Sequence, residues 1–156
     1  MKGTEKRMFN MICNIDNFLE EKECNGLIEL FKKNKSNNKQ YRNTSIFPMI
    51  YEPVLQKLCD TFTIYDFKKV DNMEIVLWPT GSEMKPHYDE GDYLSFIVYL
   101  NDDYEGGETV INGITIKPKK GLIVIFSNGF YLHQVNKITN NSRYTLIAWY
   151  KNADTK

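Results

Sequence analysis

The chain is organised around one short stretch, Lys85-Pro86-His87-Tyr88-Asp89, which holds one of its only two histidines. Because side chains alternate along a β-strand, His87 and Asp89 face one side of an extended segment and Tyr88 faces the other. Pro86 suits the start or the edge of a strand, where its missing N–H donor is tolerated. The stretch therefore predicts a strand that presents an imidazole and a carboxylate together.

The second histidine, His133, lies far downstream at the predicted start of another strand. Two imidazoles and one carboxylate on one face of a metal ion leave adjacent coordination positions open, which is the geometry of non-haem Fe(II) oxygenases. A His-x-Asp pair alone is weak, because a histidine in a strand-rich domain is often only a hydrogen-bonded polar residue. The position of His133 at the start of a separate strand favours the metal site over that alternative.

From Asp71 onward the sequence predicts short strands separated by turns. The strand ranges are 73–78, 84–88, 93–100, 108–111, 114–117, 122–126, 132–136 and 143–150. One of the turns, Asn112-Gly113, is typical of a type I′ β-hairpin. Two runs, Leu122–Phe126 and Thr145–Tyr150, are apolar on both faces, as in central strands sheltered by helices. Short strands at this spacing, with no helical pattern between them, predict a sandwich or a barrel.

One strand and two helices are predicted ahead of this β-rich core. An apolar run at 9–15 predicts the strand, and the segment 19–33 predicts a helix because its apolar residues recur at helical spacing. A second helix begins near Tyr51-Glu52-Pro53, with proline in the first turn. Between the helices, the polar stretch Asn34–Arg42 predicts a loop, which is a candidate mobile flap.

We therefore expect an α+β fold in which the two helices cover one face of the sheet. The 156 residues suit a single domain over residues 1–156, long enough to bury its own core. Its helical N-terminal part is expected at about 16–68 and its β-rich core at about 71–151.

Composition argues against several classes of partner. Formal net charge is zero, from 20 basic and 20 acidic residues, so no overall field recruits nucleic acid or a membrane. The lysine clusters at 32–35 and 117–120 lack the interleaved aromatic residues that bind single-stranded nucleic acid. The three cysteines, Cys13, Cys24 and Cys59, show no metal-ligand spacing and are expected to be buried, reduced thiols. No signal peptide or transmembrane segment is predicted, which favours a cytoplasmic location.

Arg143 is one of only three arginines and opens the last long predicted strand. Arg143 and Thr145 share a face of that strand. An exposed arginine at a strand edge commonly pairs with an acidic residue on a neighbouring strand. This strand looks core-facing, however, and a charge that enters a core needs a partner. A guanidinium with a hydroxyl beside it suits the carboxylate of a ligand, which arginine binds through two parallel hydrogen bonds.

Ordered motifs connect these residues along most of the chain. They are Asp16-Asn17-Phe18-Leu19, Trp78-Pro-x-Gly81-Ser82-x-Met84-x-Pro86-His87-Tyr88-Asp89, Tyr99-Leu100-Asn101, Gly106-Gly107-Glu108-Thr109, Lys117-Pro118-x-x-Gly121, Phe126, His133 and Arg143. The set resembles the 2-oxoglutarate/Fe(II)-dependent oxygenase superfamily, in the branch around prolyl 4-hydroxylase catalytic domains, over about residues 9–150. It departs from that branch at two positions, because prolyl hydroxylases usually carry tyrosine in place of Trp78 and lysine in place of Arg143.

The resemblance implies a double-stranded β-helix core (jelly-roll, cupin-like) with two N-terminal helices packed on one sheet. It implies that Fe(II) is bound by His87, Asp89 and His133. It further implies that Arg143, aided by Thr145, binds the C5 carboxylate of 2-oxoglutarate. Two more residues, Trp78 and Tyr99, are expected beside that co-substrate, and the part Trp78 plays is open because it lacks a phenol.

The implied activity is hydroxylation of a C–H bond with O2, coupled to decarboxylation of 2-oxoglutarate to succinate and CO2. A peptidyl residue such as proline is the leading substrate, with ascorbate as the reductant. A free amino acid or another small molecule is the next candidate substrate. A metal-binding jelly-roll sensor or binding domain without turnover and a zinc hydrolase with the same three ligands are the alternatives to an oxygenase.

Overall fold

The larger of two main sheets forms one wall of the molecule. The structure, a computed structural model, describes residues 12–41, 44–61, 70–90 and 93–151. The sheet has seven antiparallel strands in the order β1-β10-β6-β13-β4-β3-β2. They are β1 (Ile12–Ile15), β2 (Lys39–Tyr41), β3 (Thr44–Pro48), β4 (Val70–Trp78), β6 (Tyr93–Tyr99), β10 (Ile123–Ser127) and β13 (Arg143–Lys151).

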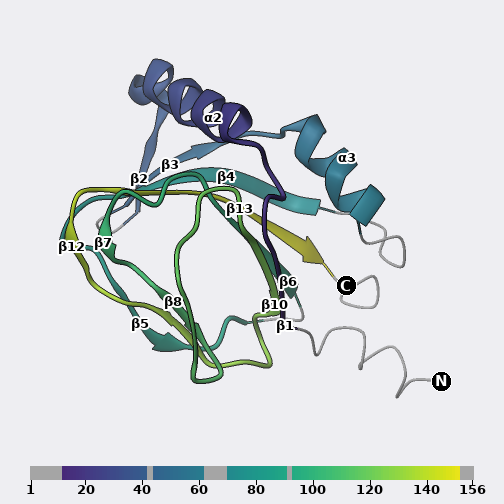
Figure 1. The fold of residues 1–156 in the computed structure, drawn as a ribbon, viewed down its shortest axis with the longest axis vertical. Coiled ribbons are helices and arrows are strands. Elements are labelled where there is room, and N and C mark those ends of the chain that lie inside the picture. The colour runs from purple at the N-terminus through teal and green to yellow at the C-terminus, as the bar shows by residue number, and fades with distance from the viewer. Residues whose placement is uncertain (1–11, 42–43, 62–69, 91–92, 152–156) are drawn as a thin grey trace.

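A second sheet faces the first and completes a double-stranded β-helix (Figure 1). Its strand order is β5-β11-β8-β9. These strands are β5 (Met84–His87), β8 (Thr109–Ile111), β9 (Ile114–Ile116) and β11 (His133–Val135), and a separate pair is formed by β7 (Glu105–Gly106) and β12 (Ile138–Asn140). The hairpin between β8 and β9 turns at Asn112 and Gly113, with φ of 51° and 77°. Positive φ at both central residues is what a type I′ turn requires, so the predicted hairpin is confirmed.

Both helices lie over one face of the larger sheet, beside β3 and β4 in Figure 1. They are α2 (Glu21–Lys33) and α3 (Glu52–Thr61), and a short 3-10 helix (Lys35–Asn37) follows α2. Leu27 and Phe31 of α2 are each 1% exposed, and burial of a side chain of this size stabilises a fold by about 1.5–3 kcal/mol. The arrangement confirms the expected helices on one sheet.

Buried side chains occupy both faces of the larger sheet. One cluster joins the helices to the sheet and includes Phe31, Leu58, Ile75 and Leu146. On the opposite face, inside the barrel, two smaller clusters gather around Tyr99 and Trp78. Burial on both faces explains why the β10 and β13 sequences are apolar without alternation.

The prediction for Asn34–Arg42 was wrong over most of its length. The segment contains the 3-10 helix and strand β2, which pairs with β3 in the register Lys39↔Ile46 to Tyr41↔Thr44. β2 is the outermost strand of the sheet, and an edge strand carries polar side chains that resemble a loop in sequence. Arg42 lies outside the described residues.

Other boundaries also moved. The first helix was expected from Leu19 but begins at Glu21, because the chain bends at Leu19, whose N–H donates to Gly121 O at 3.2 Å, and Glu20 is extended, with φ of −74° and ψ of 158°. The predicted first strand is confirmed for Ile12–Ile15, and its first residues lie outside the described part. All eight strands expected from residue 71 onward are present, whereas β2, β3, β7 and β12 were not predicted.

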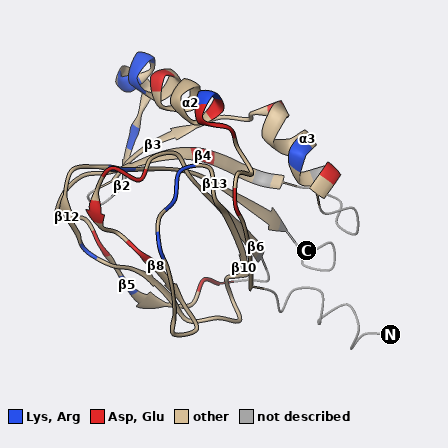
Figure 2. Ribbon diagram, viewed as in Figure 1, with Lys and Arg blue, Asp and Glu red and all other residues tan. Residues whose placement is uncertain are grey.

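Charges of both signs are spread over the ribbon, and in the view of Figure 2 neither sign gathers on one side. Within the described ranges, no helix combines the length and the apolar character that a membrane crossing would need.

Candidate functional site

Two histidines face each other across neighbouring strands at one end of the barrel. His133 of β11 is the register partner of His87 of β5. Asp89 follows directly after β5, where its backbone N–H donates to Asn128 O at 3.0 Å. Asp89 Oδ1 lies 3.2 Å from His87 Nε2, and Asp89 Oδ2 lies 3.5 Å from His133 Nε2. One ligand atom from each of the three residues lies within 4.8 Å of the others, and we call them the His–Asp–His cluster.

Hydrogen bonds to backbone carbonyls turn the same nitrogen, Nε2, toward Asp89 in both imidazole rings. His87 Nδ1 lies 2.7 Å from Lys85 O, and His133 Nδ1 lies 2.9 Å from Tyr131 O. A carbonyl oxygen only accepts, so Nδ1 is the donor in each of these bonds, and each Nε2 faces the Asp89 carboxylate. A metal-ligating histidine characteristically has this second hydrogen bond, which fixes the ring and its tautomer.

The cluster is buried on one side and open on the other. His133 is 8% exposed and its ring packs against Phe126 at a centroid distance of 4.9 Å. The side chains of His87 and Asp89 are about a third exposed, at 31% and 34%. Burial by itself lowers the pKa of His133, but the Asp89 carboxylate and the Tyr131 carbonyl outweigh it, and the net effect raises the pKa. A divalent cation would neutralise the Asp89 carboxylate in place of the extra proton on His133.

Arg143 lies inside the same barrel, at the start of β13. Cross-strand pairing sets its surroundings: Arg143 is the register partner of Trp78, and Thr145 is the register partner of Tyr99. The Arg143 guanidinium carbon lies 5.0 Å from the centroid of the Trp78 ring and 5.4 Å from that of Tyr99. The structure therefore brings together all four residues that the sequence assigned to the co-substrate.

The guanidinium is buried and has no anionic partner. Arg143 is 1% exposed, which excludes the alternative of an exposed arginine at a strand edge. Within the part of the chain that the structure describes, Arg143 forms no ion pair, and its Nη2 donates one long hydrogen bond to Thr109 Oγ1 at 3.3 Å. Arg143 Nε, Thr145 Oγ1 and Trp78 Nε1 are buried and unpaired. Burying a cation and hydrogen-bond donors without partners costs free energy, and an anion that accepts from these donors would remove that cost. These residues therefore fit the carboxylate of a ligand.

Sequence reasoning missed two polar residues near Arg143. Thr109, the first residue of β8, accepts the Arg143 hydrogen bond and also bonds the Tyr99 hydroxyl. Tyr104 precedes β7 and lies close enough to Arg143 for the guanidinium to lower its pKa, although burial raises that pKa more strongly. The Gly106-Gly107-Glu108-Thr109 motif pointed to this turn, but no periodic pattern indicated which side chains enter the barrel.

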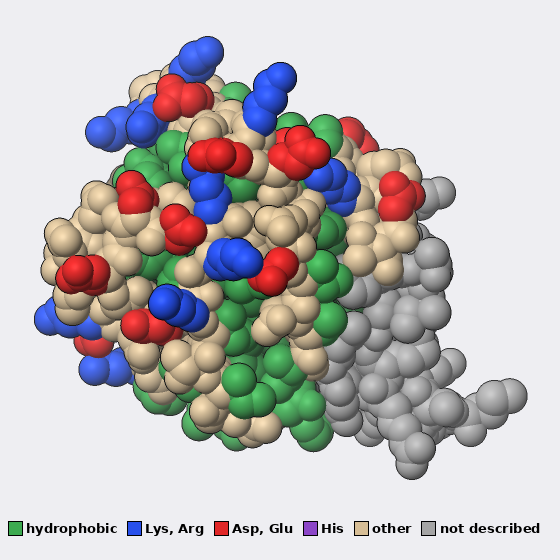
Figure 3. Space-filling view, in the orientation of Figure 1, with side chains coloured by type: hydrophobic (Ala, Val, Ile, Leu, Met, Phe, Trp, Pro, Cys, Tyr) green, Lys and Arg blue, Asp and Glu red, His purple; other side chains and the backbone are tan. Residues whose placement is uncertain are grey.

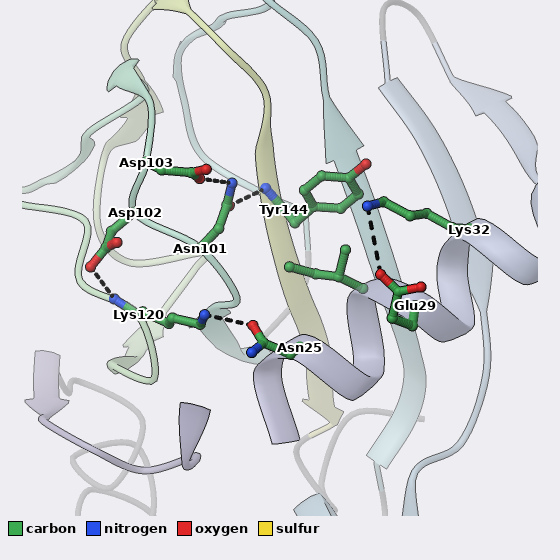
Figure 4. Close-up of a pocket in the computed structure, with 9 residues that line it drawn as sticks. Asn25, Glu29, Lys32, Asn101, Asp102, Asp103, Lys120 and Tyr144 are labelled. Carbon is green, nitrogen blue, oxygen red and sulfur yellow. Dashed lines mark hydrogen bonds and ion pairs between the residues drawn. The ribbon is translucent and has the colours of Figure 1, made fainter. Parts of the chain in front are cut away.

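A surface hollow of about 350 Å³ lies elsewhere, between α2 and the loop that follows β6 (Figure 4). Its polar groups bond one another: Lys120 Nζ donates to Asn25 Oδ1 at 2.6 Å, and Asn101 Nδ2 donates to Asp103 Oδ1 at 2.7 Å. The residues that line it include neither the His–Asp–His cluster nor Arg143. The chemistry therefore belongs to the barrel and not to this hollow.

Comparison with known sequences gives one family and a set of partial relatives. The family model of the 2OG-Fe(II) oxygenase superfamily matches residues 73–151, about half of the chain. Prolyl 3-hydroxylase 2 of rat and of human are each 36% identical over an alignment of 73 residues, and the match covers 42% of this chain. The match spans only 10% of the length of those relatives.

Comparison with solved structures gives the same fold over nearly the whole chain. A viral collagen prolyl hydroxylase of Paramecium Bursaria Chlorella virus-1, solved with 2OG, has a TM-score of 0.69 at 22% identity, covering 88% of this chain and 93% of that one. A Pseudomonas putida prolyl-4-hydroxylase has a TM-score of 0.70 at 16% identity, covering 93% and 94%. SnoN, a non-heme alpha ketoglutarate dependent epimerase from nogalamycin biosynthesis, has a TM-score of 0.72 at 12% identity, covering 98% and 82%.

Proposed function

Because the chain belongs to the 2OG-Fe(II) oxygenase superfamily, we propose that this dioxygenase hydroxylates a C–H bond of a peptidyl residue, with proline as the first candidate. The observation that carries the proposal is the presence of two sites of complementary chemistry in one barrel. The His–Asp–His cluster is a ligand set for a divalent cation, and Arg143 is a buried guanidinium that no carboxylate of the described residues pairs. Fe(II) together with a dicarboxylic 2-oxo acid matches both.

In this proposal the His–Asp–His cluster holds Fe(II). His87 and His133 each offer a neutral Nε2, because the backbone carbonyls of Lys85 and Tyr131 keep the proton on Nδ1. Asp89 supplies the negative charge from the segment that its N–H bond to Asn128 holds in place. With 2-oxoglutarate and O2 bound, the metal supplies the oxidising chemistry, in which 2-oxoglutarate is converted to succinate and CO2.

Arg143 binds and orients the co-substrate through its C5 carboxylate. The guanidinium is fixed before the ligand arrives, because the rings of Trp78 and Tyr99 pack against it and Thr109 accepts from it. A preorganised, buried guanidinium loses little side-chain freedom on binding. The unpaired Thr145 hydroxyl adds a second donor to the same carboxylate, and the aromatic walls exclude water from it.

Exposed apolar residues flank the His–Asp–His cluster in sequence, which favours a peptide substrate. Tyr88, Phe130 and Leu132 are 59%, 58% and 43% exposed. The Asp89 N–H donates to Asn128 O, which brings the segment that carries Phe130 next to Asp89. Hydrophobic side chains also gather in the lower part of the face seen in Figure 3. Exposed apolar groups of this size commonly mark a binding surface.

The test is substrate-stimulated formation of succinate. Purified protein with Fe(II), 2-oxoglutarate and O2 would be offered proline-containing peptides, the same peptides with alanine in place of proline, and free amino acids. We expect succinate formation to rise with proline peptides and a hydroxylated peptide to appear by mass spectrometry. If only free amino acids stimulate succinate formation, the substrate is a small molecule and not a peptide. Ascorbate is proposed as the reductant, and it should prolong turnover when substrate is absent.

A further inference from the structure

Tyr104 reaches Arg143 from the loop between β6 and β7. A glycine makes the approach possible: a Cβ placed on Gly107 would lie 3.0 Å from Tyr104 Cε2 and 3.2 Å from Arg143 Cδ. The side chains of Tyr104 and Arg143 therefore both occupy the space beside Gly107 that a side chain at this position would fill. Gly107 also has φ of +69°, a conformation that other residues rarely adopt.

The Tyr104 hydroxyl is buried, and its proton has no acceptor among the described residues. Its oxygen is shielded from solvent and lies close to the Arg143 guanidinium, toward which it can only accept. Burial raises the pKa of the phenol, and the nearby Arg143 lowers it without cancelling that effect. The phenol is therefore neutral at physiological pH and keeps its proton. Arginine has no acceptor atom, so Arg143 cannot take that hydrogen bond.

Other aromatic residues around Arg143 do not offer a free phenol. The Tyr99 hydroxyl is already bonded to Thr109 Oγ1. Trp78 packs its ring against the guanidinium and offers an indole N–H, not a phenol. Among the described residues near Arg143, Tyr104 alone has a phenolic O–H without an acceptor, and it lies beside the cation that attracts anions.

We propose that Tyr104 is a co-substrate-binding residue, whose phenolic O–H donates to the distal carboxylate of 2-oxoglutarate beside Arg143. The inference rests on the proposed function of the barrel. The carboxylate would then be bound by a guanidinium, a threonine hydroxyl and the phenol of a loop tyrosine.

The experiment measures ligand affinity without turnover. Calorimetric titration of Mn(II)-loaded protein compares wild type with Tyr104→Phe, which keeps the ring and removes only the hydroxyl. Two ligands are used: 2-oxoglutarate, and 2-oxopentanoate, which has a methyl group in place of the distal carboxylate. Tyr144→Phe is the matched control, because Tyr144 is adjacent to Arg143 in sequence but its ring packs on the helix side, against Phe31.

We expect Tyr104→Phe to bind 2-oxoglutarate roughly 10- to 100-fold more weakly than wild type, as for a lost hydrogen bond to a charged group. Its affinity for 2-oxopentanoate should be unchanged, and Tyr144→Phe should match wild type for both ligands. Tyr104→His, which keeps a ring N–H donor, should recover part of the loss. A cooperative melting transition shows that a variant is folded, and whichever of Tyr104→Phe and Tyr104→His meets this criterion is used for the test.

Two results overturn the inference and leave the proposed function standing: equal 2-oxoglutarate affinity in wild type and Tyr104→Phe, or an equal loss for both ligands, which indicates a structural role. Failure of wild type itself to bind 2-oxoglutarate in the presence of the metal would instead overturn the proposed function.

Discussion

Replacing Arg143 by methionine separates ligand binding from folding more sharply than any other substitution in the barrel. The arginine is 1% exposed and makes one long hydrogen bond, to Thr109 Oγ1 at 3.3 Å. Methionine keeps most of the aliphatic volume and removes the charge. The ligand-free variant thus loses a weak interaction and is relieved of a buried cation that no described carboxylate pairs. We expect its melting temperature to equal or exceed that of wild type.

The same substitution should greatly weaken binding of the co-substrate. A hydrogen bond to a charged group contributes about 1.5–3 kcal/mol, so Arg143→Met should bind 2-oxoglutarate roughly 10- to 150-fold more weakly. Affinity for the metal should be unchanged, because the His–Asp–His cluster lies on other strands, β5 and β11, and their flanks. Arg143→Lys keeps the charge but not the planar fork, and we expect an intermediate affinity.

Calorimetry measures the affinity of the protein for Mn(II) and the affinity of the Mn(II)-loaded protein for 2-oxoglutarate. Thermal melting of the ligand-free protein measures stability. The reasoning is refuted by a variant that binds 2-oxoglutarate like wild type. A large drop in the melting temperature of Arg143→Met would also count against it, because that result means the guanidinium already has a stabilising partner in the free protein.

Three further substitutions or measurements test other parts of the structure. His87→Ala and Asp89→Ala should each abolish succinate formation and weaken Mn(II) binding in calorimetry, and turnover at the wild-type rate would remove the cluster from the site. Burial raises the pKa of Cys24 to about 11, so at pH 8 its thiolate fraction is small. Alkylation of Cys24 in the folded protein, measured by mass spectrometry, should therefore be far slower than alkylation of the partly exposed Cys13. Comparable alkylation rates at the two cysteines would contradict the burial of α2. Gly107→Ala places a methyl group against Tyr104 and Arg143 at positive φ, and we expect a loss of at least about 1–2 kcal/mol in chemical denaturation, whereas wild-type stability would show that the turn relaxes freely.

The strands that carry the site could be predicted because their physical signals are local. Alternation by two residues put His87 and Asp89 on one side, and turn residues such as Asn112-Gly113 divided the β-rich half correctly. β2 was missed because it is a short polar edge strand that resembles a loop, and β3 was missed because its five residues show no alternating apolar pattern. Pairing with β4 and β3, and not the sequence itself, makes them strands.

The surroundings of Arg143 could be predicted only in part. Thr145 follows from the two-residue period of one strand, and the family resemblance supplied Trp78 and Tyr99. The cross-strand register that sets Arg143 beside Trp78 depends on how β4 and β13 align, which no local pattern states. Tyr104 lies in a loop without periodicity, so its buried hydroxyl becomes visible only when Gly107 is seen to admit both its ring and Arg143.

Formation of succinate from 2-oxoglutarate by the wild-type protein tests the central claim most directly. The account predicts succinate that requires added Fe(II), stops when O2 is removed, and is lost in both His87→Ala and Arg143→Met at co-substrate concentrations that saturate wild type. The absence of succinate with Fe(II), O2 and every substrate offered would contradict it, as would an activity of the wild-type protein that continues unchanged under anoxia.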